Sequence, residues 1–168
     1  DRMFSPQLGN IEWNYVASRN TGIFAMMLTS EASNPFAPQN EEGIKIAGDE
    51  KKNGDKKDED VVAPVKIEFD GLAARVARAP MEFDDYSALR THGDHLLVVR
   101  SGASFYGRDP VPAPELVAYS IDDRESFVIA KDISGYAAAA KSDHVDVVQG
   151  EAVNRFAISK DEQEGDKI

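Results

Sequence analysis

The histidines are the side chains in this sequence that first suggest metal chemistry. His92 and His95 are three residues apart with Asp94 between them, and His144 stands alone further along the chain. In an extended strand or turn, that spacing points the first two rings to opposite faces. Zinc requires an organised set of three or four ligands. We therefore interpret residues 91–95 as a polar hairpin turn and predict no metal site.

Serine chemistry would need a nucleophile on a strained turn, a base and an orienting acid. Glycine neighbours serine in Ser101-Gly102-Ala103-Ser104 and in Ser134-Gly135, but neither segment forms a Gly-x-Ser-x-Gly motif. We interpret both as loop and turn residues and predict no catalytic residue in this chain. Since the sequence has no cysteine, thiolate catalysis, disulfides and cysteine-built zinc sites are excluded.

The acidic segment Asp122-Asp123-Arg124-Glu125 resembles a cation-binding loop only superficially. It lacks the regular acidic spacing and the closing glutamate of a calcium loop. Aspartate often bonds to its own backbone in turns, so we predict a hairpin turn here. No cofactor is expected.

One loop is a candidate contact surface. Phe105, Tyr106 and Arg108 lie in a segment rich in glycine and proline, residues 101–114, where aromatic side chains would be exposed beside a cation. The other aromatic residues occupy expected strands, where we predict that they pack in the core. They are Trp13, Tyr15, Phe24, Phe69, Tyr119, Phe127 and Phe156.

The sequence predicts that short strands position these side chains. Apolar residues alternate with polar ones, and turn signals recur about every eight to twelve residues. We predict an all-β fold of antiparallel four-stranded meander blades, forming a partial β-propeller of about three blades. Expected strands in the first half are Ile11–Val16, Ile23–Leu28, Val65–Phe69 and Ala74–Met81. Those in the second half are Tyr86–Thr91, His95–Arg100, Glu115–Ile121, Ser126–Lys131, Gly135–Ala140, His144–Val148 and Val153–Ile158.

The whole chain, 1–168, is interpreted as a single propeller fragment with blade regions at 1–85, 86–132 and 133–160. Residues 161–168 form an acidic tail that would lead into a missing downstream part. A charged hairpin insert at 40–63 interrupts the first blade region. It lacks enough apolar residues to bury, so we expect it to be solvated and to have little function.

The net charge of the chain is −11 over 168 residues, with 42% hydrophobic residues. The apolar content is sufficient for a core. An acidic chain is repelled by nucleic acid and by anionic membranes, so neither is expected as a partner. No run approaches the length of about 20 apolar residues that a membrane span needs.

The segments around the charged insert resemble the β-propeller region of bacterial tricorn-like serine peptidases. The resemblance rests on Ser33-Asn34-Pro35-Phe36-Ala37-Pro38, then on the return through Val65 to Pro80 with its Arg75-Val76 pair. It extends in the same order to Asp1-Arg2, Tyr86–Arg90, Leu116–Ile121 and Ser134-Gly135-Tyr136. The chain departs from the family pattern at Glu68, where aspartate is usual, and over Met81–Asp85.

This resemblance implies a non-catalytic propeller segment that scaffolds a serine peptidase or gates peptide access to it. The partners implied are the remaining blades, a PDZ-like domain and a peptidase domain, with peptides as substrates of the parent protein. Open blade edges would also favour self-association. The compartment is not determined, with the periplasm or secretion slightly favoured over the cytoplasm. The alternative is a stand-alone β-rich module that binds peptide or glycan.

Overall fold

The computed structural model describes residues 18–38, 64–102, 109–139, 142–161 and 165–168. It also gives the backbone of two short paired strands, β1 (Gln7–Leu8) and β2 (Tyr15–Val16). All strand pairs in these residues are antiparallel, and their only helical element is a single 3-10 turn, η1 (Leu72–Ala74). The predicted all-β class is therefore confirmed. The chain divides into two compact units, residues 1–22 with 81–168 and residues 23–80.

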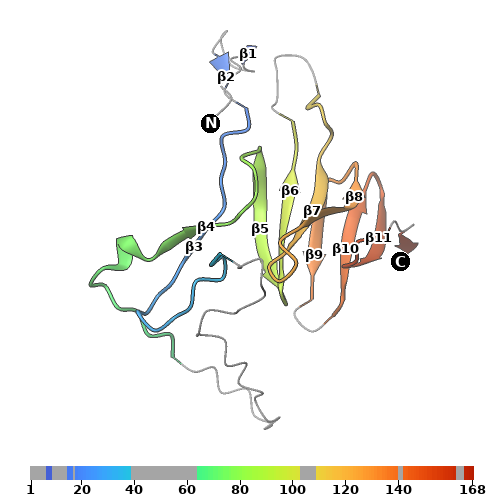
Figure 1. Ribbon diagram of the computed structural model, residues 1–168. Coiled ribbons are helices and arrows are strands. Elements are labelled where there is room, and N and C mark those ends of the chain that lie inside the picture. Colours follow the sequence, from blue (N-terminus) through green and yellow to red (C-terminus); the bar gives the residue numbers. More distant parts are fainter. Residues whose placement is uncertain are drawn as a thin grey trace. The chain divides into compact units, whose positions relative to one another are not determined.

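The larger unit contains a four-stranded sheet in simple meander order (Figure 1). Its strands are β5 (Tyr86–His92), β6 (His95–Arg100), β7 (Glu115–Ser120) and β8 (Ser126–Lys131). Each strand coincides within about one residue with one expected from the sequence. The turn residue Gly93 has a φ of 53°, a conformation that glycine adopts without strain. Alternation and turn chemistry were thus sufficient to locate this sheet.

A second four-stranded sheet follows in the same unit. It has the order β9 (Gly135–Ala138), β10 (His144–Gln149), β11 (Ala152–Ala157) and β12 (Asp166–Lys167). The last strand lies in the segment that we interpreted as an acidic tail. Gly165 permits it, because a Cβ atom there would lie 2.4 Å from the Phe156 ring. The close approach lets Asp166 pair with Arg155.

These two sheets share one hydrophobic core. Buried residues from β6 to β8 pack with Val145, Val147 and Phe156 from β10 and β11. All six residues of β7 are buried, so both faces of this strand are shielded from water. A strand buried on both faces belongs to an interior layer, which is why Glu115–Ser120 reads as a nearly continuous apolar run rather than an alternating one.

The smaller unit is built around a two-stranded ribbon, β3 (Phe24–Met26) with β4 (Val76–Arg78). The predicted strand at Val65–Phe69 was wrong. The guanidinium group of Arg75 instead binds three backbone oxygens, those of Met27, Glu68 and Asp70. A side chain thus holds this segment in place of a strand ladder, and the ribbon remains two-stranded.

The burial of aromatic side chains differs between the larger and the smaller unit. Tyr119 and Phe156 are buried and Phe127 packs against the core, as predicted. The prediction was wrong for Phe24 and Phe69, which are exposed. A two-stranded ribbon has too little surface to cover aromatic side chains of this size.

Candidate functional site

The predicted contact residues Phe105, Tyr106 and Arg108 lie outside the described residues, but the base of their loop is well described. The N–H of Gly102 donates to the carbonyl oxygen of Pro112 over 2.8 Å. A Cβ atom on Gly102 would lie 2.1 Å from the carbonyl oxygen of Val111. Only glycine permits this approach. The two ends of the loop between β6 and β7 are therefore in direct contact.

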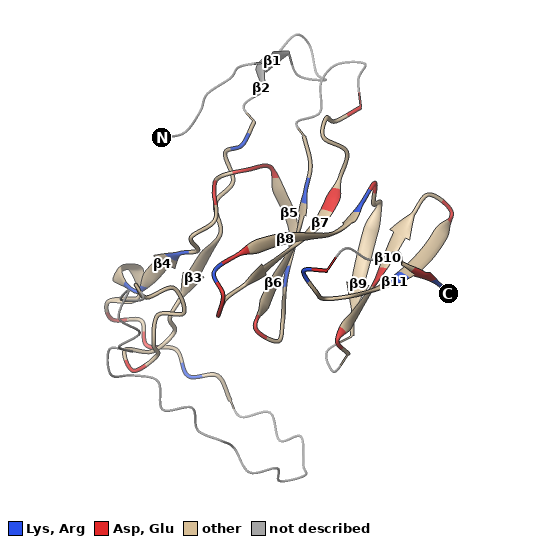
Figure 2. Cartoon of the chain, turned by 45° about the vertical axis from the view of Figure 1, so that its right-hand side comes forward, with Lys and Arg blue, Asp and Glu red and all other residues tan. Residues whose placement is uncertain are grey.

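A row of polar side chains crosses the sheet at the end from which this loop departs. We call Tyr86, Arg100, Glu115 and Lys131 the loop-base row, because each is paired with the next across β5 to β8. Nε of Arg100 donates to Oε1 of Glu115 over 2.8 Å, and an Nη of Arg100 contacts the same oxygen at 2.5 Å. Figure 2 shows the blue and red segments side by side at this end of β6 and β7.

The buried carboxylate of Glu115 needs this cation. Glu115 is only 8% exposed, and an unpaired charge at such a position would be strongly destabilising. The Arg100–Glu115 pair was not predicted from the sequence, although the positions of the two residues indicate it. Arg100 ends one expected strand and Glu115 begins the next, so an antiparallel meander places them at the same end of the sheet.

A second cluster of charges adjoins the loop-base row. The backbone N–H of Arg19 donates to Asp85 over 2.8 Å, and its guanidinium lies 3.3 Å from Glu82 and 3.8 Å from Asp84. Burial raises the pKa of the Tyr86 hydroxyl, and the Asp84 carboxylate raises it further. The acids and the base of this cluster are therefore paired with one another.

The histidine geometry differs from the expectation in one respect. His92 and His95 are directly opposed across the β5–β6 turn, so their side chains share a face. The prediction of opposite faces was wrong, because the residues belong to two strands of a tight hairpin. Nε2 of His92 lies 2.5 Å from the carbonyl oxygen of Ser142, and the His95 ring packs edge-on against Phe127. Within the described ranges, no group of three or more acidic or histidine side chains could hold a metal ion.

The two serine segments have structural roles where they are described. The N–H of Ser101 donates to the carbonyl oxygen of Asp85, beside the loop base. Ser134 donates both its N–H and its hydroxyl group to the carbonyl oxygen of Val148, over 2.8 and 3.3 Å. These bonds fix the entry into β9.

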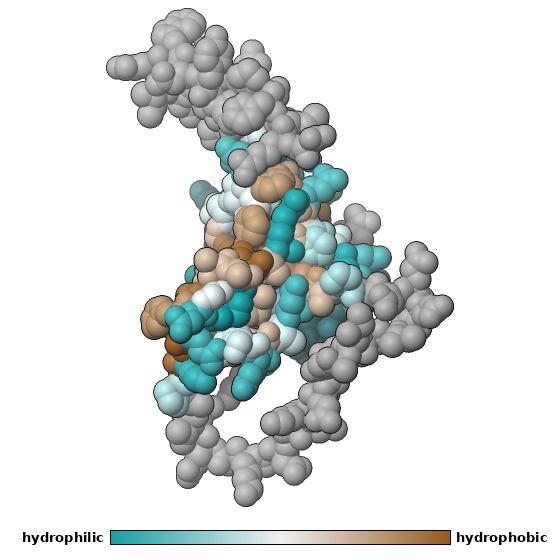
Figure 3. Space-filling model, turned by 60° about the vertical axis from the view of Figure 1, so that its left-hand side comes forward, coloured by the Kyte–Doolittle hydropathy of each residue, from teal (hydrophilic) through white to brown (hydrophobic). Residues whose placement is uncertain are grey.

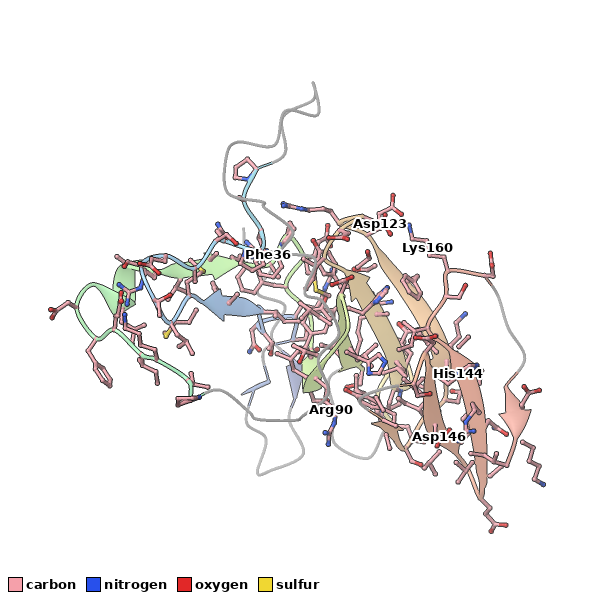
Figure 4. All side chains as sticks on the ribbon, turned by 90° about the horizontal axis from the view of Figure 1, so that it is seen from below. Phe36, Arg90, Asp123, His144, Asp146 and Lys160 are labelled. Atoms are coloured by element: carbon pink, nitrogen blue, oxygen red, sulfur yellow. The ribbon has the colours of Figure 1, made fainter. Side chains whose placement is uncertain are left out.

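The acidic turn after β7 is a hairpin turn, as predicted. Arg124 has a φ of 60°, and the Ser120 hydroxyl donates to the carboxylate of Asp123 over 3.0 Å. Nζ of Lys160 approaches Glu125 at 2.7 Å and Asp123 at 3.5 Å, so a cation from the chain itself occupies this turn. Figure 4 shows Asp123 and Lys160 near each other at this edge of the structure.

The outward face of the second sheet is polar around β10 and β11. Nε and one Nη of Arg155 donate to the two carboxylate oxygens of Asp146, over 2.7 and 3.1 Å, and this interaction lowers the pKa of the Asp146 carboxyl. His144 is two residues away on the same strand and therefore on the same face. The paired charges satisfy one another on an exposed surface.

Comparison with known proteins gives no assignment. No family model, no curated protein and no solved structure matches the chain. Among the described residues, no helix is long and apolar enough to cross a membrane.

Proposed function

We propose that the chain is a non-catalytic segment of a β-propeller from a tricorn-like serine peptidase, which scaffolds or gates peptide access to a catalytic domain elsewhere in the parent protein. The observation that carries this proposal is the succession of two antiparallel four-stranded meanders, β5–β8 and β9–β12, that share a core. Propeller blades are four-stranded meanders that pack face to face around a channel. The sequence motifs around the charged insert, which resemble those of the tricorn-like family and follow the same order, add independent support.

The burial of β7 on both faces also supports the proposal. An inner layer between two neighbours is the environment of a propeller blade. Exposure rises toward β5, whose central residues from Ser87 to Thr91 are all exposed. A blade whose first strand borders an open channel would have this distribution.

The loop-base row suggests how such a segment would meet peptides. The loop that carries Phe105, Tyr106 and Arg108 departs from a rigid base that is joined by Gly102 and stabilised by the Arg100–Glu115 pair. Aromatic side chains and an arginine on a fixed base could contact the side chains and carboxylates of passing peptides.

The first test is the coding sequence around this chain. We expect a PDZ-like segment and then a serine peptidase domain after the codon for Ile168. An open reading frame that starts directly before Asp1 and stops directly after Ile168 would contradict the proposal.

The second test uses the parent peptidase. The triple change Phe105→Ala, Tyr106→Ala and Arg108→Ala should raise KM for long peptides several-fold while leaving cleavage of a tripeptide substrate unchanged. Val111→Ala is the matched control, because its side chain is exposed in the same loop but outside the contact residues. Equal loss with both substrates would argue for damage to the fold instead of a gating role.

A stand-alone peptide- or glycan-binding module is the second candidate. Two sheets that pack face to face over one core are also the arrangement of a β-sandwich. This candidate predicts saturable binding of a peptide or oligosaccharide by the isolated chain, which calorimetry against peptide and glycan libraries would detect. The propeller proposal predicts no such binding without the neighbouring blades.

A further inference from the structure

Asp70 and Gly71 form the one Asp-Gly dipeptide of the sequence, at the turn that leads into η1. Gly71 has a φ of 71°, in the left-handed region that glycine adopts without strain. Figure 3, which brings the side of β3 and β4 to the front, shows polar side chains in teal open to water over this part of the smaller unit. Both residues are exposed, so water reaches the Asp70 carboxyl and the peptide bond beside it.

The two groups that could react with each other at this turn are free of competing bonds. Among the residues that the structure describes, the Asp70 carboxylate has no hydrogen bond or ion pair, and the Gly71 N–H donates to no acceptor. A succinimide ring forms when the nitrogen after an aspartate attacks the carboxyl carbon of that aspartate. Glycine has no side chain that hinders the attack, and the two groups belong to the same short stretch of chain.

The guanidinium group of Arg75 is bound to the peptide group that would react. Its Nη1 donates to the carbonyl oxygen of Asp70 over 2.7 Å, and this carbonyl belongs to the same amide as the Gly71 nitrogen. A hydrogen bond from a cation withdraws electron density from the amide and stabilises negative charge on its oxygen, so the N–H loses its proton more readily. Bonds to the carbonyl oxygens of Met27 and Glu68 hold the guanidinium in this position.

We propose that Asp70 converts to isoaspartate in the folded chain and that Arg75 promotes the reaction. The Gly71 nitrogen loses its proton and bonds to the carboxyl carbon of Asp70, and the carboxyl group loses a hydroxyl, so one water molecule leaves. The resulting succinimide takes up water at either of its carbonyl carbons. Attack at the side-chain carbonyl regenerates aspartate, whereas attack at the main-chain carbonyl gives isoaspartate. The reaction consumes no oxidant, reductant or cofactor.

Isoaspartate would change the backbone of the smaller unit. Its main chain runs through Cβ and the former side-chain carbonyl, so the backbone becomes longer by one carbon at this turn. Arg75 follows the insertion, while its acceptors Met27 and Glu68 precede it, so the added carbon changes the spacing that these bonds require. We therefore expect the turn and the segment 64–69 to loosen as the chain ages, without any change in mass.

Asp132 provides a comparison within the same chain. It is exposed and has a positive φ of 55°. The N–H of the next residue, Ile133, however donates to the carbonyl oxygen of Pro114 over 3.0 Å. A nitrogen that is held in this way, beside a β-branched side chain, is poorly placed to attack. Asp132 should therefore remain aspartate under conditions that convert Asp70.

The primary experiment is incubation of the full 168-residue chain in mildly acidic buffer, sampled over several weeks. Trypsin cleaves after Lys66 and Arg75, which places Asp70 in the peptide 67–75. Reversed-phase chromatography separates the isoaspartyl form of this peptide from the aspartyl form, and electron-transfer fragmentation identifies it.

We expect isoaspartate to accumulate at Asp70 at least about ten times faster than at Asp132, because only the first has an unhindered and unbound nitrogen beside it. Asn53 precedes a glycine and could undergo related chemistry, but it falls in a different tryptic peptide. Asp70→Glu is the matched control. It keeps the charge, but glutamate would need a larger ring that closes far more slowly, so no product should form at this position.

Variants of Arg75 test its part in the reaction. Arg75→Gln should slow the conversion roughly ten-fold, because a neutral amide stabilises the developing charge less than a guanidinium does. Arg75→Lys retains a cation and should restore part of the rate. The natural chain should also react faster when folded than in guanidinium chloride, where the contact with Arg75 is lost. In that denaturant the natural chain and Arg75→Gln should react at equal rates.

Three results would overturn the proposal. The absence of isoaspartate at position 70 would rule out the site. The role of Arg75 would be refuted by a natural chain that reacts no faster folded than unfolded, or by an Arg75→Gln chain that reacts as fast as the natural one. The inference does not depend on the proposed function, because the coding-sequence test is decided separately.

Discussion

The hydroxyl group of Tyr136 donates a hydrogen bond to the carbonyl oxygen of Ala88 over 2.6 Å, which ties the second sheet to a bulge in the first. Ala88 has a φ of 50°, and the pairing of β5 with β6 shifts between Ser87 and Arg90. The same hydroxyl lies 3.2 Å from the carbonyl oxygen of Leu97. A bulge leaves a backbone oxygen without a ladder partner, and Tyr136 supplies that partner from β9.

Removing this hydroxyl should weaken the contact between the sheets. Tyr136→Phe keeps the ring packing but leaves the carbonyl oxygen of Ala88 without this donor, so we expect a loss of about 1–2 kcal/mol in the free energy of unfolding. Urea denaturation followed by far-UV circular dichroism would measure it. Ala88→Gly is the companion variant: a residue with positive φ gains by becoming glycine, so it should leave stability unchanged or raise it by up to about 1 kcal/mol. A destabilised Ala88→Gly protein would show that the bulge does not have this backbone conformation.

Acid should loosen the smaller unit through Glu68. Hydrogen bonds from Lys66 and from Ser30 lower the pKa of this carboxyl from 4.5 to about 2. A carboxyl with a lowered folded-state pKa stabilises the fold fully above its unfolded value, and the contribution is lost as the pH falls from 4.5 to about 2. The protection of the Ser30 amide from hydrogen exchange, followed by NMR, should decline over that window. Glu68→Gln should abolish the pH dependence, and an unchanged profile in this variant would exclude Glu68 as its source.

Prediction from sequence succeeded where strands alternate and turns carry glycine or acidic residues. The β5–β8 sheet was located this way, because His92-Gly93-Asp94-His95 and Asp122–Glu125 both mark hairpins between periodic strands. It failed over Val65–Phe69, whose alternation is clean but whose Glu68 carbonyl oxygen is bound by the Arg75 side chain. Periodicity cannot show which group satisfies a backbone oxygen.

The candidate site was less predictable. The Arg100–Glu115 pair depends on register, which the positions of two strand ends determine only after the sheet order is known. β12 was missed because two residues are too few for a periodic pattern, and its position depends on the close approach at Gly165. The propeller architecture and the peptidase assignment remain proposals.

The Arg100–Glu115 pair should show strong energetic coupling. Glu115→Gln and Arg100→Met each leave a charged partner in a partly buried position, so each should cost about 1–3 kcal/mol of stability. The double variant should cost less than the sum, with a coupling energy of about 1–2 kcal/mol, because neither charge then remains unpaired. Urea unfolding of all four proteins would complete the cycle. If the two losses were additive, the ion pair itself would contribute nothing to stability beyond the packing of each side chain.

Gly165 should be essential for the attachment of β12. In Gly165→Ala, the new Cβ would lie 2.4 Å from the buried Phe156 ring and 2.9 Å from Cβ of Asn154, so either the ring or the strand must move. We expect the strand to detach, since it is held by few bonds, among them the one from the N–H of Ile168 to the carbonyl oxygen of Val153 at 3.1 Å. Hydrogen exchange should then show lost protection at residues 166–168 while β7 stays protected. Gly135→Ala is the control, because its Cβ would meet no atom within 4 Å. If β12 stayed protected in Gly165→Ala, the Phe156 ring must have yielded, and the loss of protection would appear in the core around Val145 instead.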